Sequence, residues 1–304
     1  MRELGAAWQR FWFEPEETST LALVRIAFGL LVFAWAVTLT HDASSLFSGS
    51  GILPDSGYDG RPSAVWSVLD LTDSGLAVGL VVAGLSIASL FLIAGLYTRL
   101  ASVVVFVLLV SLERRNPFVF NSGDGLLKVI AFYMVLAPAG ASLSLDRWRR
   151  ARDAFWEFPR REPWPLRLMQ VQLSILYLAT VWTKLSGTTW NDGTAISYAA
   201  RLEDLTRFEL PHSIATSELV VNLMTYGTLA AEAAIGILVW NRRLRPWVLG
   251  LGVFLHLAID LTMRVGFFSY AVFVLYLAFV PPEAVSSRLL AVRKRVFGTA
   301  RATA

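Results

Sequence analysis

The feature that most constrains the fold is a succession of long apolar segments that fills most of the chain. A helix that crosses a membrane needs roughly 17–25 mostly apolar residues, and eight segments approach that length. The chain has 304 residues, of which 55% are hydrophobic and only 16% are charged. This composition is typical of an integral membrane protein and excludes an ordinary soluble domain. The predicted spans are residues 20–40, 74–96, 98–113, 125–139, 165–187, 217–240, 244–263 and 266–282.

The positions of the basic residues predict how these spans are oriented. Cytoplasmic loops of membrane proteins are enriched in lysine and arginine. Here one set of alternate loops holds most of the arginines, and the other set is rich in aspartate and glutamate. We therefore predict an all-α, polytopic bundle of about eight transmembrane helices in the cell membrane, with both termini in the cytoplasm. The modest net charge of +4 follows from this asymmetry and does not indicate a nucleic-acid surface.

Residues 1–17 are predicted to form an N-terminal helix that lies in the membrane interface. Its acidic residues are unlike the positive start of a signal peptide, and Pro15 is expected to end it. The transmembrane domain then covers residues 18–284 and is followed by a basic cytoplasmic tail, residues 285–304. The apolar and aromatic residues that share one face of the first helix are Leu4, Trp8, Phe11 and Trp12.

We make further predictions for three of the segments that connect the spans. Residues 41–73 and 188–216 form long outside loops, and loops of this length are often functional. Inside, residues 141–163 combine arginines with aromatic side chains. They predict a second interfacial segment that is held by anionic membrane lipid.

Lys184 is the most informative single residue, because it ends the apolar run that starts at Tyr177 and is followed by Trp190 and Gly193. A lysine at a helix centre costs roughly 2.5–3.5 kcal/mol on insertion scales, so an intramembrane lysine is a candidate functional residue. Lys184 also lies close to the end of its span. Its long stem could therefore carry the amine to water by snorkelling, which is the structural alternative.

Other ionisable residues fall within predicted spans. Glu232 is near the middle of its helix and is expected to face the bundle interior, either protonated or paired with a cation. Asp260 lies one turn after His256 and is expected to orient its imidazole; a hydrogen bond between helices is the alternative. Arg25 and Lys128 lie near span ends and are expected to snorkel.

Asp124 precedes the fourth span at its outside mouth, and its simplest role is that of a helix N-cap. The histidines are scattered without ligand spacing, so no metal site is predicted. The chain has no cysteine, which excludes disulfides, thiolate metal sites, Fe–S clusters and a cysteine nucleophile. Phosphate-binding loops and nucleophile elbows are also absent from the sequence.

Several of these stretches resemble one family. Tyr177, six intervening residues, Lys184 and Leu185, with Trp190 and Gly193 after them, are similar to the catalytic-lysine segment of vitamin K-dependent gamma-glutamyl carboxylases. His256, Gly266 and the run 268–270 match the same family. Residues 21–26 and 144–148 look like its bacterial branch, the horizontally transferred transmembrane (HTTM) domain proteins. The resemblance covers nearly the whole chain.

This resemblance implies an enzyme that uses a reduced naphthoquinone, such as menaquinol or vitamin K hydroquinone, as cofactor. In the family, the lysine deprotonates the quinol, and reaction with oxygen generates a strong base. This base takes a γ-proton from glutamate, carbon dioxide adds, and the quinone leaves as an epoxide. The predicted site faces outward, with Lys184 and His256 as catalytic residues. Residues expected to bind substrate or cofactor are Tyr177, Trp190, Glu232, Asp260 and Asp124.

The sequence departs from the carboxylases at three points. Thr183 stands where a second lysine is common, residues 114–125 hold no histidine, and the chain ends soon after Pro282 without the family's large extramembrane domain. A second hypothesis therefore stands beside the enzyme. Here the chain is a non-catalytic membrane accessory protein for the maturation or export of a secreted peptide, as some bacterial relatives are. Membrane lipids, an isoprenoid quinone and such a peptide are the expected partners.

Overall fold

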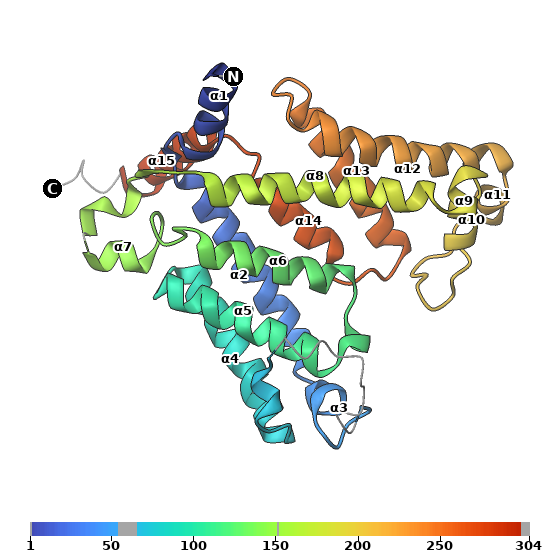
Figure 1. The fold of residues 1–304 in the computed structure, drawn as a ribbon, viewed down its shortest axis with the longest axis horizontal. Helices are drawn as coiled ribbons and strands as arrows, with labels where there is room; N and C mark the ends of the chain where they lie inside the picture. The colour runs from blue at the N-terminus through green and yellow to red at the C-terminus, as the bar shows by residue number, and fades with distance from the viewer. Residues whose placement is uncertain (1, 54–65, 151, 299–304) are drawn as a thin grey trace. The chain divides into compact units, whose positions relative to one another are not determined.

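The computed structural model describes residues 2–53, 66–150 and 152–298, and it is built almost wholly of helices (Figure 1). Each of the eight predicted spans contains a helix, which confirms the predicted all-α class. These helices are α2 (Ser19–Leu39), α4 (Gly75–Ala94), α5 (Thr98–Arg115), α6 (Ser122–Leu136), α8 (Trp164–Leu185), α12 (Glu218–Leu238), α13 (Arg245–Thr262) and α14 (Phe268–Leu277).

Three of these helices, α2, α4 and α12, are long and apolar enough to cross a membrane by length and composition alone. The number rises to four if α14 and α15 (Pro282–Phe297) form one broken span, all counted within the described residues. The first helix, α1 (Arg2–Phe13), ends before Pro15 as predicted. Its interfacial position stays a prediction. Much of the predicted basic tail is helical, since α15 runs to Phe297; residues 299–304 lie outside the described part.

The long loops contain short helical turns. The described part of the first outside loop holds α3 (Ala43–Phe47) and the 3₁₀ turn η1 (Val68–Asp70), whereas its residues 54–65 lie outside the description. The remaining short elements are η2 (Pro117–Val119), α7 (Leu145–Arg150), η3 (Arg152–Trp156), α9 (Thr188–Asn191), α10 (Ala195–Ala199), α11 (His212–Ala215), and the two-residue strands β1 (Glu16–Glu17) and β2 (Arg160–Arg161).

The chain divides into two compact units, which are described separately. Unit 1 comprises Met1–Met169 and Val280–Ala304, and unit 2 comprises Gln170–Phe279, so α8 begins in one unit and continues in the other. Unit 1 is therefore discontinuous in sequence. Its two parts are joined by hydrogen bonds from the hydroxyl groups of Ser19 and Thr20 to the backbone carbonyls of Pro282 and Val280.

In unit 1 the helices α2, α4, α5 and α6 pack side by side in chain order (Figure 1). The turn between α4 and α5 is tight because Gly95 adopts a left-handed conformation, with φ +67°. This conformation favours glycine. A Cβ atom at this position would also overlap Ser144. Large side chains that are fully buried in this unit include Phe28, Leu85, Leu112, Leu127 and Ile130.

Segments that were predicted to share one side of the membrane lie together at the ends of unit 1. At one end, β1 pairs antiparallel with β2, which ties the N-terminal segment to the 137–163 segment. At the other end, the Asn116 side chain donates to the Leu46 carbonyl, and the Arg115 guanidinium donates to the Ser48 carbonyl. The grouping agrees with the pattern of predicted inside and outside loops.

Arg25 does not snorkel, contrary to the sequence-based expectation. Its side chain is fully buried, and its guanidinium donates hydrogen bonds to the carbonyls of Ala139, Ser142 and Leu143 at 2.7–3.2 Å. These carbonyls belong to the turn after α6, where the backbone has left the helix and its acceptors need partners. Arg25 therefore fixes that turn to α2.

The amine of Lys128 is held by an ion pair and does not simply extend into water. The amine lies 2.6 Å from a carboxylate oxygen of Glu113 on the neighbouring helix α5. Both side chains stay about one-third exposed, so the pair lies at the edge of unit 1. Such exposed pairs contribute little to stability.

Unit 2 contains most of α8 together with α12, α13 and α14. The loop after α8 is attached to the end of α13, since Thr206 pairs with Met263 and the Arg207 amide donates to the Thr262 carbonyl. At the opposite ends of the helices, Arg245 donates to the carbonyls of Val239 and Phe279. Gly236 lets α12 approach α8 closely, because its missing Cβ would lie 3.2 Å from Leu178.

Replacing Arg25 by methionine should destabilise the protein by about 3 kcal/mol, because three buried carbonyls would lose their donor. Unfolding in sodium dodecyl sulfate measures the change. Arg10→Met, at an exposed position on α1, is the matched control and should be neutral. A snorkelling Arg25 predicts the opposite result, namely that both variants are as stable as the parent.

Candidate functional site

A buried ion pair between α8 and α12 is the centre of the candidate site. Lys184 lies in the last turn of α8, and its Nζ is 2.5 Å from Oε1 of Glu232, which lies within α12. The side chains are 19% and 8% exposed, respectively. Glu232 thus faces the interior and is paired with a cation, as predicted. The amine of Lys184 is held by this carboxylate rather than extended into water, so the snorkelling alternative does not describe this structure.

Trp190 covers the amine of this pair. The centroid of its ring lies 4.6 Å from Nζ of Lys184, which is the geometry of a cation–π contact. The short helix α9 holds the ring in place, since the Asn191 side chain donates to the Leu185 and Gly187 carbonyls. Trp190 therefore supplies a flat aromatic wall beside the charge.

Tyr177, His256 and Tyr276 form a hydrogen-bonded chain across three helices. The Tyr177 hydroxyl lies 2.7 Å from Nε2 of His256 and also bonds to the Tyr276 hydroxyl. All three residues are buried. Gly252 makes room for this chain, because a Cβ atom there would overlap the Tyr276 hydroxyl.

Sequence reasoning missed Tyr276. A tyrosine inside an apolar helix is itself a signal, since a buried hydroxyl usually has a partner. Tyr276 lies in α14, where the neighbouring residues are apolar. That pattern could have indicated an interhelical hydrogen bond, although it would not have named Tyr177 as the partner.

His256 lies in an aromatic environment and is not oriented by Asp260, contrary to expectation. The rings of Phe268 and Phe273 have centroids 5.7 and 6.0 Å from that of His256. Asp260 instead accepts a hydrogen bond from the Tyr270 hydroxyl on α14 at 3.0 Å, so the alternative, a hydrogen bond between helices, describes this residue. Neighbouring helices decide this outcome, since a tyrosine on α14 reaches the carboxylate.

Three buried polar atoms in this region have no hydrogen-bond partner within the described part of the chain. They are Oε2 of Glu232, Nδ1 of His256 and Oδ1 of Asp260. Buried polar atoms normally find partners, so an unpaired one needs an explanation such as a ligand or a catalytic role. Among the described residues, no group of three or more His, Cys, Asp or Glu side chains could hold a metal ion.

The ion pair and the hydrogen-bonded chain act on each other electrostatically. The Lys184 ammonium interacts electrostatically with the His256 imidazole. The Glu232 carboxylate interacts in the same way with the hydroxyl groups of Tyr177 and Tyr276. We call this set of six residues in unit 2 the Lys184 cluster; it consists of Tyr177, Lys184, Trp190, Glu232, His256 and Tyr276. The cluster combines an amine, a carboxylate, an imidazole and two phenol hydroxyls, which are groups used in general acid–base chemistry.

Asp124 belongs to unit 1 and has a structural role there. The predicted N-cap of α6 is wrong by three residues: Asn121 is the cap, and Asp124 completes the capping box by accepting from the Asn121 amide. Its other oxygen accepts from the indole of Trp35 at 2.7 Å. These hydrogen bonds connect the start of α6 to α2.

One comparison with known proteins gave a match. The model of the family described as HTTM domain matches residues 65–283. No curated protein and no solved structure matches the chain. The matched range includes every residue of the Lys184 cluster.

Breaking the buried ion pair from either side should cost about 3–5 kcal/mol, because one charge would stay buried without its partner. Glu232→Leu and Lys184→Met should each lower the free energy of unfolding in sodium dodecyl sulfate. The double variant should recover most of that loss.

The more exposed pair Lys128 and Glu113 provides the matched control for this cycle. Lys128→Met and Glu113→Leu should show a coupling energy below about 1 kcal/mol. Strictly additive losses at Lys184 and Glu232 would contradict the assignment of these residues as a coupled pair.

Proposed function

This chain belongs to the HTTM domain family, and from that premise we propose that it is a membrane-integral, vitamin K-dependent carboxylase-like enzyme. Its cofactor is a reduced naphthoquinone such as menaquinol, and Lys184 is the base. The observation that carries the proposal is the buried contact between Lys184 and Glu232. A general base must lie within hydrogen-bond reach of the proton that it takes, and burial and charged neighbours adjust its basicity.

The carboxylate beside Lys184 determines how the amine can act as a base. In the resting ion pair the amine carries a proton and cannot accept another. Transfer of that proton from Nζ to Glu232 leaves a neutral amine and a neutral acid, a state that a low-dielectric site favours relative to separated charges. With the cofactor bound, the neutral amine would accept a proton from the cofactor's hydroxyl group, and as an ammonium Lys184 would offset the negative charge left beside it.

The residues of the cluster suit a naphthoquinone. Trp190 offers a flat surface for an aromatic ring beside the amine. The unpaired Oε2 of Glu232 and Nδ1 of His256 are available as polar contacts for the ligand or the substrate carboxylate. The hydrogen bond from Tyr177, whose hydroxyl also bonds to that of Tyr276, holds Nε2 of His256 in place. When bound, the reduced naphthoquinone supplies the electrons that reduce dioxygen.

We further propose that all eight helices cross the cell membrane, that both termini are cytoplasmic and that the Lys184 cluster opens outward. The asymmetry of arginines between alternate loops supports this topology. The joined loops at each end of unit 1 agree with it.

Single cysteines test the topology, since the native chain has none. Ser50 and Arg150 are both exposed. In intact cells, an impermeant maleimide should label Ser50→Cys and should reach Arg150→Cys only after permeabilisation. Labelling of Arg150→Cys in intact cells contradicts the proposed orientation.

The variant Lys184→Arg tests whether Lys184 is the catalytic base. Arginine keeps the positive charge but is a very poor base, so formation of menaquinone epoxide from menaquinol, oxygen and a glutamate-containing peptide should fall at least about 100-fold. The assay uses purified protein in nanodiscs. Lys128→Arg changes the paired lysine of unit 1 in the same way and should leave the rate unchanged. Equal rates for Lys184→Arg and the parent would rule out Lys184 as the base.

The accessory function is the second candidate, and exposed apolar side chains favour it. Between α10 and α11 the loop presents Leu202, Leu205 and Phe208, each 43–59% exposed. A secreted peptide or its export machinery could bind such a surface. Absence of turnover by the parent enzyme, with correct folding, supports this candidate over the enzyme.

A further inference from the structure

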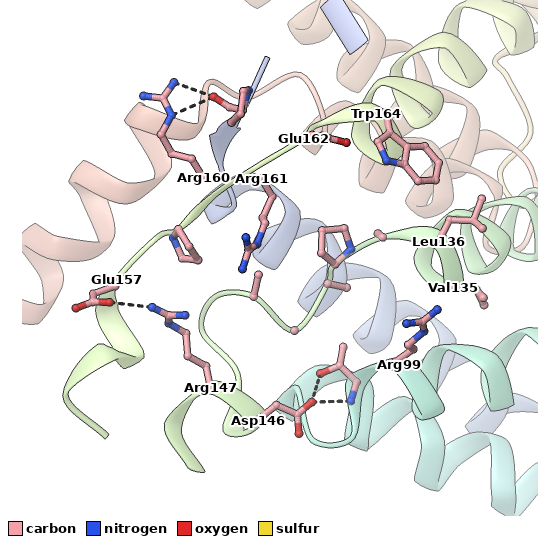
Figure 2. A pocket seen from close by; sticks show the side chains of 18 of the residues that line it. Arg99, Val135, Leu136, Asp146, Arg147, Glu157, Arg160, Arg161, Glu162 and Trp164 are labelled. Atoms are coloured by element: carbon pink, nitrogen blue, oxygen red, sulfur yellow. Dashed lines mark hydrogen bonds and ion pairs between the residues drawn. The ribbon is translucent and has the colours of Figure 1, made fainter. Parts of the chain in front are cut away.

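A large basic cavity lies at the end of unit 1 where the N-terminal segment, the α4–α5 turn and residues 137–164 meet. Its volume is about 980 Å³, and it is separate from the Lys184 cluster. Figure 2 shows it between the start of α5, the end of α6 and the chain that leads into α8. Five arginines line it: Arg99, Arg147, Arg150, Arg160 and Arg161.

Two of the five arginines have partners in the protein. Arg147 pairs with Glu157 at 2.8 Å. Arg160 points away from the cavity and donates to the Pro15 carbonyl, as Figure 2 shows. These two side chains connect parts of the cavity wall. The positive charge for binding a ligand therefore comes from Arg99, Arg150 and Arg161.

The acidic residue Asp146 is also occupied within the wall. It accepts hydrogen bonds from the Tyr97 and Thr98 amides and from the Thr98 hydroxyl, all at 2.8 Å. Burial raises its pKa, but these hydrogen bonds and the nearby Arg150 outweigh that effect and bring the pKa below its ordinary value. Asp146 is therefore an ionised cap on α5 rather than a free acceptor.

The remaining arginines give the cavity an excess of positive charge. Within the described residues, the guanidinium groups of Arg99 and Arg161 make no hydrogen bond or ion pair. Arg161 points from β2 toward the loop between α6 and α7 (Figure 2). Arg150 lines the same cavity. The lining also holds three carboxylates; Asp146 and Glu157 have the partners described above, and Glu162 is the third. The cavity thus suits an anion with several oxygens, because arginine binds phosphate through paired N–H donors.

One wall of the same cavity is apolar. It is formed by Val135 and Leu136 at the end of α6, by Pro138 and by Trp164 at the start of α8. Leu136 is 38% exposed. These residues end one predicted span and begin the next, and tryptophan is typical of the membrane interface. Arginines beside such a wall match an amphiphile, whereas a free phosphate would leave the wall unused.

We propose that this cavity is a binding site for an anionic phospholipid, with the phosphate group at Arg99, Arg150 and Arg161 and the acyl chains leaving along Leu136 and Trp164. The chemistry recognised is a phosphate ester with net negative charge. The site ties a lipid to three segments that are distant in sequence, and it does not depend on the proposed enzyme activity.

Native mass spectrometry of the delipidated full chain tests the proposal with dioleoyl phosphatidylglycerol and dioleoyl phosphatidylcholine. The parent should bind the anionic lipid more tightly. The double variant Arg99→Gln, Arg161→Gln should weaken that binding by roughly 30-fold, since one basic residue near anionic lipid contributes about fivefold. Lys294→Gln with Arg295→Gln removes the same charge from α15, outside the cavity lining, and should stay within about twofold of the parent.

Each other outcome overturns the proposal. If both double variants weaken binding of the anionic lipid equally, the lipid is attracted by the general surface charge and not by this cavity. Displacement of phosphatidylglycerol by equimolar inorganic phosphate, with no preference over phosphatidylcholine, assigns the site to free phosphate instead. If the cavity variant fails to fold by size-exclusion chromatography, Arg161→Gln is compared with Arg295→Gln, and about fivefold weakening is expected for Arg161→Gln only.

Discussion

The low dielectric constant around apolar helices sets the main constraint on this structure. An ionised side chain there is stable only with a partner close by, and the described helices meet this requirement in different ways. Arg25 is held by three backbone carbonyls, whereas Lys184 is held by Glu232. Each solution joins elements that are far apart in sequence. Charged residues, which are few in this chain, therefore determine which parts of the apolar helices must meet.

This constraint also separates what the sequence predicts from what it does not. Helix positions follow from the length of each apolar run, and all eight were found close to the predicted ranges. That Glu232 needs a partner follows from its depth in α12. The identity of that partner does not follow, because Lys184 is 48 residues earlier and local spacing carries no information about it.

Local spacing was misleading at His256. Asp260 lies one turn away on the same helix face, which predicted a pair, but the carboxylate bonds to Tyr270 and the imidazole to Tyr177. Competing donors on other helices decided both contacts. Arg25 was misjudged for a related reason, since its partners are backbone carbonyls of residues 139, 142 and 143, and carbonyls have no signature in a sequence.

The discontinuity of unit 1 has a consequence for biosynthesis. The hydroxyl groups of Ser19 and Thr20 bond to carbonyls of residues 282 and 280, which the ribosome adds near the end of translation. Helix α2 must therefore remain without these partners during translation, and the Arg25 guanidinium stays unsatisfied until the turn after α6 has been made. Unit 2 is one continuous stretch and can complete its contacts before the chain closes unit 1. The packing of unit 1 can therefore be completed only after its C-terminal part has been made.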